Sequence, residues 1–121
     1  MPLSVNIEKK DEQCIITTLA GPLDTITYRI FEDKTRDTVG HECKAVVLDM
    51  EGVNYISSMG LSVVLRLRKK VETAGGELTL TNLQPKIRKV FEVSKIIPDL
   101  IAFKSRIEAD MYLDKIQREE E

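Results

Sequence analysis

Two adjacent serines, Ser57 and Ser58, are the residues of this sequence whose type and position could carry chemistry. They stand in "YISSMGLSVV", between a hydrophobic run and a helix-like stretch, and Gly60 follows two positions after the second serine. A serine at a helix start can accept a hydrogen bond from an unpaired backbone N–H, a capping role typically worth about 1 kcal/mol. Its hydroxyl can also act as a nucleophile or accept a phosphoryl group. From the local pattern alone, capping is the favoured interpretation.

A serine hydrolase is disfavoured by the surrounding sequence. A strand–serine–helix junction invites comparison with the nucleophile elbow of hydrolases, but the Gly-x-Ser-x-Gly pattern is absent. The only histidine, His41, lies before the predicted central strand, which argues against a catalytic triad. We therefore predict that the protein is not an enzyme.

Metal and cofactor sites are not expected either. Asp49 and Glu51 flank the end of a predicted strand, but no set of further ligands accompanies them. Cys14 stands in an apolar run and is predicted to be a buried small hydrophobe. Cys43 and the nearby histidine form a single His–x–Cys, which is too sparse for a zinc site, and no CxxC pair exists.

The elements that must position the two serines alternate along the chain. Hydrophobic periodicity predicts strands at residues 3–8, 14–19, 44–50 and 77–82, with a short last strand inside 97–103. The first two strands should form a hairpin. The strand at 44–50 is a continuous apolar run, typical of a central strand covered on both faces.

Four helices are predicted between and after these strands. The first is capped by Asp24 and runs to about Thr38, with Ile26 and Ile30 on one side. The remaining three are indicated by apolar spacing, and their core positions are Gly60, Val63, Val64, Leu67 and Val71 in the second, Ile87, Val90 and Phe91 in the third, and Ala109, Tyr112, Leu113 and Ile116 in the fourth. Pro85 suits the first turn of the third helix, "AGG" closes the second, and Ser105 with Glu108 forms a capping box before the last.

This order predicts an α/β fold with a mixed, mainly parallel sheet of about five strands and about four helices. Residues 1–121 fit a single domain, and the last few residues form a charged tail. Functional sites on such sheets usually lie at the carboxyl ends of strands. Two stretches occupy such places: "GPLD" at residues 21–24 and the serine pair.

The chain resembles the STAS domain, and most closely the small bacterial anti-sigma factor antagonists. The resemblance runs from about Leu3 to Ile116, and it is carried by "GPLD", by residues 45–82 and by "PKIRKVFEVSKI" at residues 85–96. No single short piece decides it. The order, the spacing and the total length together make it specific, and they imply the STAS fold.

The resemblance also implies the functional residues. The family has an Asp-Ser-Ser/Thr-Gly tetrad at the start of a helix, and a partner kinase phosphorylates its first serine. Ser58 falls on this phosphoacceptor position and Gly60 on the glycine, with Ser57 as a less favoured acceptor. Ser57 replaces the usual Asp, and Met59 replaces the small hydroxyl residue. Asp24 matches the acidic residue of the family's "GELD" loop, which borders the phosphorylation site.

A partner switch is the function that the resemblance implies. The dephosphorylated antagonist binds an anti-sigma factor that is also a serine kinase of the histidine-kinase-like ATPase fold, and the sigma factor is released. Phosphorylation ends that complex, and a metal-dependent serine phosphatase resets it. The implied partner-binding residues are Asp24, Ser57, Ser58, Met59, Gly60 and Leu61.

Several of these residues also have a purely structural interpretation. Asp24 can be a helix N-cap as well as a contact to the kinase or to the hydroxyl of Ser58. Leu61 and Leu65 fall off the main core face, where they pack on a neighbouring element or form an exposed contact patch; the family interface favours the patch for Leu61. Residues Arg66, Arg68, Lys69 and Lys70 are expected to form a solvated helix face.

A second function stays open at this point: a STAS scaffold that is not phosphorylated, as in stressosome-like assemblies or beside a transporter or lipid-trafficking system. The altered tetrad favours it. The net charge of −2 argues against nucleic acid as a partner. No run is long enough for a membrane helix and no signal peptide is evident, so we expect a cytoplasmic protein. A homodimer through an exposed helix patch is compatible with the sequence.

Overall fold

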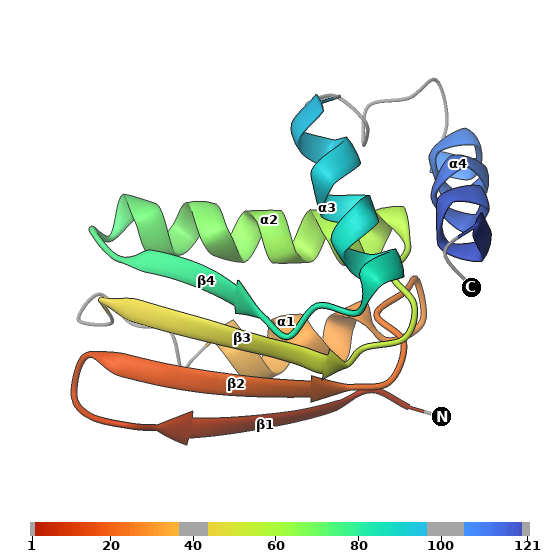
Figure 1. Ribbon diagram of the computed structural model, residues 1–121. Coiled ribbons are helices and arrows are strands. Elements are labelled where there is room, and N and C mark those ends of the chain that lie inside the picture. Colours follow the sequence, from red (N-terminus) through yellow and green to blue (C-terminus); the bar gives the residue numbers. More distant parts are fainter. Residues whose placement is uncertain (1, 37–43, 97–105, 120–121) are drawn as a thin grey trace.

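The structure is a computed structural model that describes residues 2–36, 44–96 and 106–119 (Figure 1). In these residues the chain forms four strands and four helices. In chain order they are β1 (Ser4–Lys9), β2 (Cys14–Ala20), α1 (Tyr28–Arg36), β3 (Ala45–Gly52), α2 (Ser58–Thr73), β4 (Glu77–Thr81), α3 (Pro85–Ile96) and α4 (Arg106–Glu119). The predicted mixed α/β fold is confirmed. The short strand predicted inside 97–103 and the capping residue Ser105 lie outside the described residues.

The four strands form one sheet in the order β1-β2-β3-β4. The β1–β2 pair is antiparallel, as the predicted hairpin requires, and the β2–β3 and β3–β4 pairs are parallel. The core face is built from alternate residues, because successive side chains of a strand point to opposite faces. Its buried members in β2 and β3 are Ile15, Thr17, Leu19, Val46, Leu48 and Met50.

The opposite face of the sheet is less covered than the sequence predicts. In β3 the residues between the buried ones, including Val47, are only half-buried. The apolar run at 44–50 therefore does not mark a strand covered on both faces, and that prediction is wrong. Cys14 pairs with Ala45 on this second face and is likewise half-buried rather than buried.

Helix α1 begins later than predicted. The Asp24 side chain accepts hydrogen bonds from the backbone N–H groups of Ile26 and Thr27, so a turn precedes the helix. Phe31 and Thr35 form the buried side of α1, while Ile26 is 85% exposed. The prediction of a buried side with Ile26 is therefore wrong, because Ile26 lies in the capping turn. The predicted end near Thr38 lies outside the described residues.

Helix α2 runs alongside β4 (Figure 1) and carries the predicted core positions. It ends where the "AGG" segment predicts: Gly75 has a φ of +86°, and the Gly76 N–H donates to the Val71 carbonyl at 2.9 Å. This is the hydrogen-bond pattern of a glycine-terminated helix.

Helices α3 and α4 complete the described fold. The predicted positions Ile87, Val90 and Phe91 of α3 are buried, as are Leu113 and Ile116 of α4. Helix α4 packs against both α3 and α2, and Figure 1 shows it at the end of α2 where that helix begins. In the described ranges, no helix combines the length and the apolar character needed to cross a bilayer.

Candidate functional site

The two loops singled out in the sequence lie side by side at the carboxyl ends of β2 and β3. Leu23, in the "GPLD" loop, forms a parallel β-bridge with Ile56. The Leu23 N–H donates to the Tyr55 carbonyl at 2.9 Å, and the Ser57 N–H donates to the Leu23 carbonyl at 3.0 Å. The chain therefore fixes the Asp24 loop against the serine pair through backbone hydrogen bonds.

Gly60 allows the first turn of α2 to rest on this loop. A Cβ atom at position 60 would lie 2.2 Å from the Leu23 carbonyl oxygen, which no side chain tolerates. The glycine of the tetrad thus has a structural reason in this chain: it permits the close approach of α2 to the "GPLD" backbone.

Ser57 is the N-cap of α2. Its backbone is extended, with φ −93° and ψ 175°, and its Oγ accepts a hydrogen bond from the Gly60 N–H at 3.2 Å. Its carbonyl accepts the first bond of the helix, from the Leu61 N–H at 2.8 Å. The capping interpretation is confirmed for Ser57.

Ser58 has a different environment. It is the first residue of α2, it is 2% exposed, and its backbone N–H donates to Asp110 Oδ1 at 2.8 Å. Its Oγ is buried and has no hydrogen-bond partner. In the described part of the chain, no other buried side-chain oxygen or nitrogen lacks a partner. Ser58 is therefore not a surface residue in this structure, and its backbone contact with Asp110 places α4 at the start of α2.

Three polar residues of α4 face the serine segment. Asp110, Asp114 and Gln117 are spaced four and three positions apart, which places them on one side of a helix. Asp110 receives the Ser58 N–H, and Asp114 receives the hydroxyl of Tyr55. Sequence reasoning missed this row, although its spacing within an amphipathic helix was a visible signal.

Gln117 makes the most complete of these contacts. Its Oε1 accepts from the Ile56 N–H at 2.9 Å, and its Nε2 donates to the Ile56 carbonyl at 2.8 Å. Gln117 is 3% exposed and Ile56 is fully buried. The side chain therefore satisfies two backbone groups that no water reaches.

Carboxylates dominate the electrostatics of the site. Burial raises the pKa of Tyr55 well above its usual value, and the hydrogen bond to Asp114 and the charges of Asp114, Asp110 and Asp24 raise this pKa further. Each of these carboxylates opposes the ionisation of the phenol. Asp110 also stabilises the site, because a negative group is favourable at a helix N-terminus.

Asp24 acts as a capping residue. Its Oδ1 accepts from the Ile26 and Thr27 N–H groups at 2.9 and 3.0 Å, and its own N–H donates to Thr27 Oγ1 at 3.0 Å. Asp24 therefore caps the turn at residues 25–27 that precedes α1, and it is not the residue directly before the helix. Within the described ranges no hydrogen bond joins Asp24 to Ser58, so a role in presenting that hydroxyl stays a prediction.

The apolar neighbours of the serines divide into two groups. Met59 and Leu65 are half-buried, whereas Leu61 is fully buried in the core. An exposed patch that includes Leu61 is therefore wrong, and a contact of Leu61 with a partner stays a prediction.

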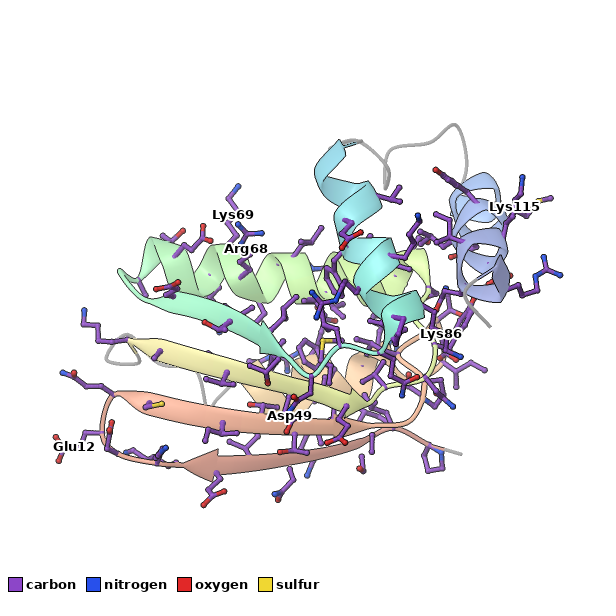
Figure 2. All side chains as sticks on the ribbon, viewed as in Figure 1. Glu12, Asp49, Arg68, Lys69, Lys86 and Lys115 are labelled. Carbon is purple, nitrogen blue, oxygen red and sulfur yellow. The ribbon has the colours of Figure 1, made fainter. Side chains whose placement is uncertain are left out.

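The basic residues of α2 lie on its solvated side. Arg66 forms an ion pair with Glu32 at 3.0 Å, and Arg68 forms one with Glu72 at 2.9 Å. Figure 2 shows Lys69 pointing away from the sheet, whereas Arg68 lines a groove that α2 shares with β4 and α3. These pairs are exposed, so each contributes little to stability.

The carboxylates at the end of β3 serve a turn. Asp49 Oδ1 accepts from the Glu51 N–H at 3.1 Å and from Asn82 Nδ2 at 3.2 Å. In the ranges that the structure describes, no cluster of three or more potential ligands could hold a metal ion. His41 and Cys43 lie outside these ranges.

The chain is similar to known proteins in both sequence and fold. The STAS domain profile matches residues 4–109. BtrV of Bordetella bronchiseptica, named as an anti-sigma factor antagonist, is 36% identical over 85 residues, 70% of this chain and 73% of BtrV. The anti-sigma-B factor antagonist of Bacillus subtilis is 24% identical over 107 residues, 88% of this chain and 96% of its own. The anti-sigma factor antagonist SpoIIAA, solved in its unphosphorylated form, has the same fold, with a TM-score of 0.63, 22% identity, and coverage of 74% of this chain and 82% of SpoIIAA.

Proposed function

The chain belongs to the STAS domain family, and from this premise we propose that it is an anti-sigma factor antagonist. In its dephosphorylated form it binds an anti-sigma factor that is also a serine kinase of the histidine-kinase-like ATPase fold, and the sigma factor is released. The similarity to BtrV, at 36% identity over most of both chains, supports this role. The protein itself performs no catalysis and acts in the cytoplasm as a single domain.

The position of Ser58 is the observation that carries the proposal. Ser58 is the first residue of α2, directly after an N-cap and two residues before a glycine that the fold requires. The loop of Asp24 lies against it through the Leu23–Ile56 bridge. This is the arrangement that the resemblance implied for a phosphoacceptor, and Ser57 is less suited because its Oγ is engaged as the cap.

The proposed modification is the transfer of the γ-phosphoryl group of ATP to Ser58. Ser58 Oγ forms a bond to the γ-phosphorus of ATP, the bond from that phosphorus to the β–γ bridging oxygen breaks, and ADP leaves. The hydroxyl proton passes to a base of the kinase. The product carries about −1.5 to −2 charges at neutral pH. A partner surface matched to a neutral serine would have to bury this charge, which is costly, so the complex dissociates.

The partner surface that we propose contains Asp24, Ser57, Ser58, Met59, Gly60 and Leu61. Asp24 and Met59 are partly accessible in this structure, whereas both serines are buried. A metal-dependent serine phosphatase would restore the hydroxyl and the binding state.

A scaffold that is not phosphorylated is the second candidate, and one observation favours it. Ser58 is 2% exposed and its Oγ is buried, so a kinase cannot reach this hydroxyl in this conformation. A scaffold would use the outer surface of the domain and leave this serine silent.

Binding and release separate the two candidates. The protein is titrated into a complex of the anti-sigma kinase with its sigma factor, in the absence of ATP, and free sigma factor is measured. The antagonist predicts release by the native protein and by Ser58→Ala, with loss of release after stoichiometric phosphorylation of the native protein only. If the protein binds the kinase and ATP never changes this binding, the scaffold is favoured. If the protein neither binds the kinase nor releases the sigma factor, the antagonist role is refuted.

A further inference from the structure

We propose that α4 is a reversible cover over Ser58, and that a phosphoryl group on Ser58 and docked α4 exclude each other. The proposal rests on the proposed function, in which Ser58 is the phosphoacceptor. It adds a regulatory state: α4 must lift before the kinase acts, and phosphorylation keeps it lifted.

The first support is the burial of the acceptor. Transfer from ATP requires the Ser58 hydroxyl to meet the γ-phosphorus in line, and a 2% exposed residue offers no room for a triphosphate. Asp110 closes the helix start by receiving the Ser58 N–H at 2.8 Å. The transfer therefore needs a conformation in which α4 has moved away.

The second support is the unpaired Oγ of Ser58. A buried hydroxyl without a partner costs free energy, and a residue with only a structural role would gain from losing it. Alanine would fit the same space. A role of Ser58 as a phosphoacceptor beneath α4 explains why this position has a hydroxyl although the hydroxyl makes no hydrogen bond.

The third support is the set of polar contacts that help to attach the cover, beside two apolar side chains of α4 that are buried in the core. Asp110 binds a backbone N–H, Asp114 binds the Tyr55 hydroxyl, and Gln117 binds both backbone groups of Ile56. When α4 lifts, water can replace each of these partners, so no polar group is left unsatisfied. Local opening of such a segment is less costly than unfolding the domain.

The fourth support is electrostatic. A phosphate on Ser58 would lie at the same helix start as the Asp110 carboxylate, which accepts from the Ser58 N–H there, and the two anions would repel each other. It would also meet the charges of Asp114 and Asp24, which already act on Tyr55 in this site. Lys115, one of the cations near these residues on α4, is exposed and points away from α2 (Figure 2), so it is not placed to offset the repulsion.

Asp110 also explains a departure of this sequence from the family. Ser57 stands where the tetrad has Asp, which removes a carboxylate from the helix start. Asp110 supplies a carboxylate at the same helix start from another element. Here the negative charge is attached to a helix that can move.

The decisive test uses charge and needs no kinase. Hydrogen exchange is measured in Ser58→Glu and in the isosteric Ser58→Gln, each alone and combined with Asp110→Asn. We expect α4 amides to exchange at least about tenfold faster in Ser58→Glu than in Ser58→Gln, and Asp110→Asn to reduce this difference. Amides of β3 should stay protected in all four variants, which shows that the domain is folded. Equal exchange in the Glu and Gln variants, whether fast or slow, would overturn the proposal.

A second arm ties the cover to phosphorylation. Initial rates of phosphate incorporation by the serine kinase are compared for native protein, Asp110→Ala and the exposed control Lys115→Ala. We expect Asp110→Ala to react at least about tenfold faster and Lys115→Ala at the native rate. If the native protein reacts as fast as Asp110→Ala, the cover is refuted and the antagonist stands. If no variant reacts, the proposed phosphorylation fails, and the exchange experiment still decides whether charge at position 58 releases α4.

Discussion

Asp110 of α4 accepts a hydrogen bond from the backbone N–H of Ser58 at 2.8 Å, and this bond joins two helices that are 52 positions apart at the contact. Helix α2 is thereby capped twice, by Ser57 from its own chain segment and by Asp110 from α4. Ser58, the phosphoacceptor that we propose, lies at this doubly capped helix start and uses its hydroxyl for neither cap.

The two serines should respond differently to alanine. Ser57→Ala removes the N-cap bond to Gly60 and should lower the free energy of unfolding by about 1 kcal/mol. Ser58→Ala removes a buried hydroxyl that has no partner, so stability should be unchanged or rise by up to about 1 kcal/mol. Urea unfolding of both variants beside the native protein measures the difference. A larger loss in Ser58→Ala than in Ser57→Ala would contradict the assignment.

Gly60→Ala should be among the more damaging single-methyl changes in the chain. The new Cβ would lie 2.2 Å from the Leu23 carbonyl oxygen, so α2 must shift away from the "GPLD" loop. We expect a loss of about 2–3 kcal/mol, in the range of overpacked sites. Thermal unfolding tests this, and Gly76→Ala, at the end of the same helix, is the comparison. If Gly60→Ala and Gly76→Ala lower stability by the same small amount, the fold does not require the close approach of α2 to the "GPLD" loop.

Gln117→Ala should destabilise the protein through two backbone groups. The N–H and carbonyl of Ile56 would stay buried without their partners, and each such group typically costs about 1–3 kcal/mol. The exposed neighbour Lys115→Ala should change stability by less than about 0.5 kcal/mol. Chemical denaturation of the pair gives the comparison. A Gln117→Ala protein as stable as Lys115→Ala would mean that α4 does not seal this segment.

Stability should fall at high pH through Tyr55. Its pKa is raised in the folded protein, so the folded state holds the phenol proton more tightly than the unfolded state, where the pKa is about 10. The contribution is fully present below about pH 10 and is lost as the pH rises towards the folded value. Unfolding by urea between pH 8 and pH 11 should show a steeper loss in native protein than in Tyr55→Phe. Parallel pH profiles would contradict a raised pKa.

Much of the fold could be predicted because its signals are local. The hairpin, the central strand and α2 follow from alternation and helical spacing, and the "AGG" stop follows from glycine geometry. The errors also have physical causes. Ile26 was assigned to a helix side because it has the right spacing from Ile30, but the Asp24 side chain holds it in a turn before α1. Apolar composition alone could not reveal that one face of β3 is only half covered.

The candidate site was predictable only in part. The tetrad register and the pairing of the Asp24 loop with the serine segment follow from the resemblance. The burial of Ser58 could not be predicted. Asp110, Asp114 and Gln117 belong to a helix more than fifty residues later, and the sequence around the serines does not indicate that this helix packs there. Leu61 was misjudged for a related reason: α2 is covered on more than one side at its start, so residues off the main core face are also buried there.

The most direct test of the central claim is intact-mass analysis after incubation with ATP and each anti-sigma serine kinase of the protein's own organism. Native protein, Ser57→Ala and Ser58→Ala are compared under identical conditions. We predict a gain of one phosphate in the native protein and in Ser57→Ala, and none in Ser58→Ala. A phosphate gain that persists in Ser58→Ala would contradict the assignment of the acceptor, and no gain with any kinase would contradict the phosphorylation switch itself.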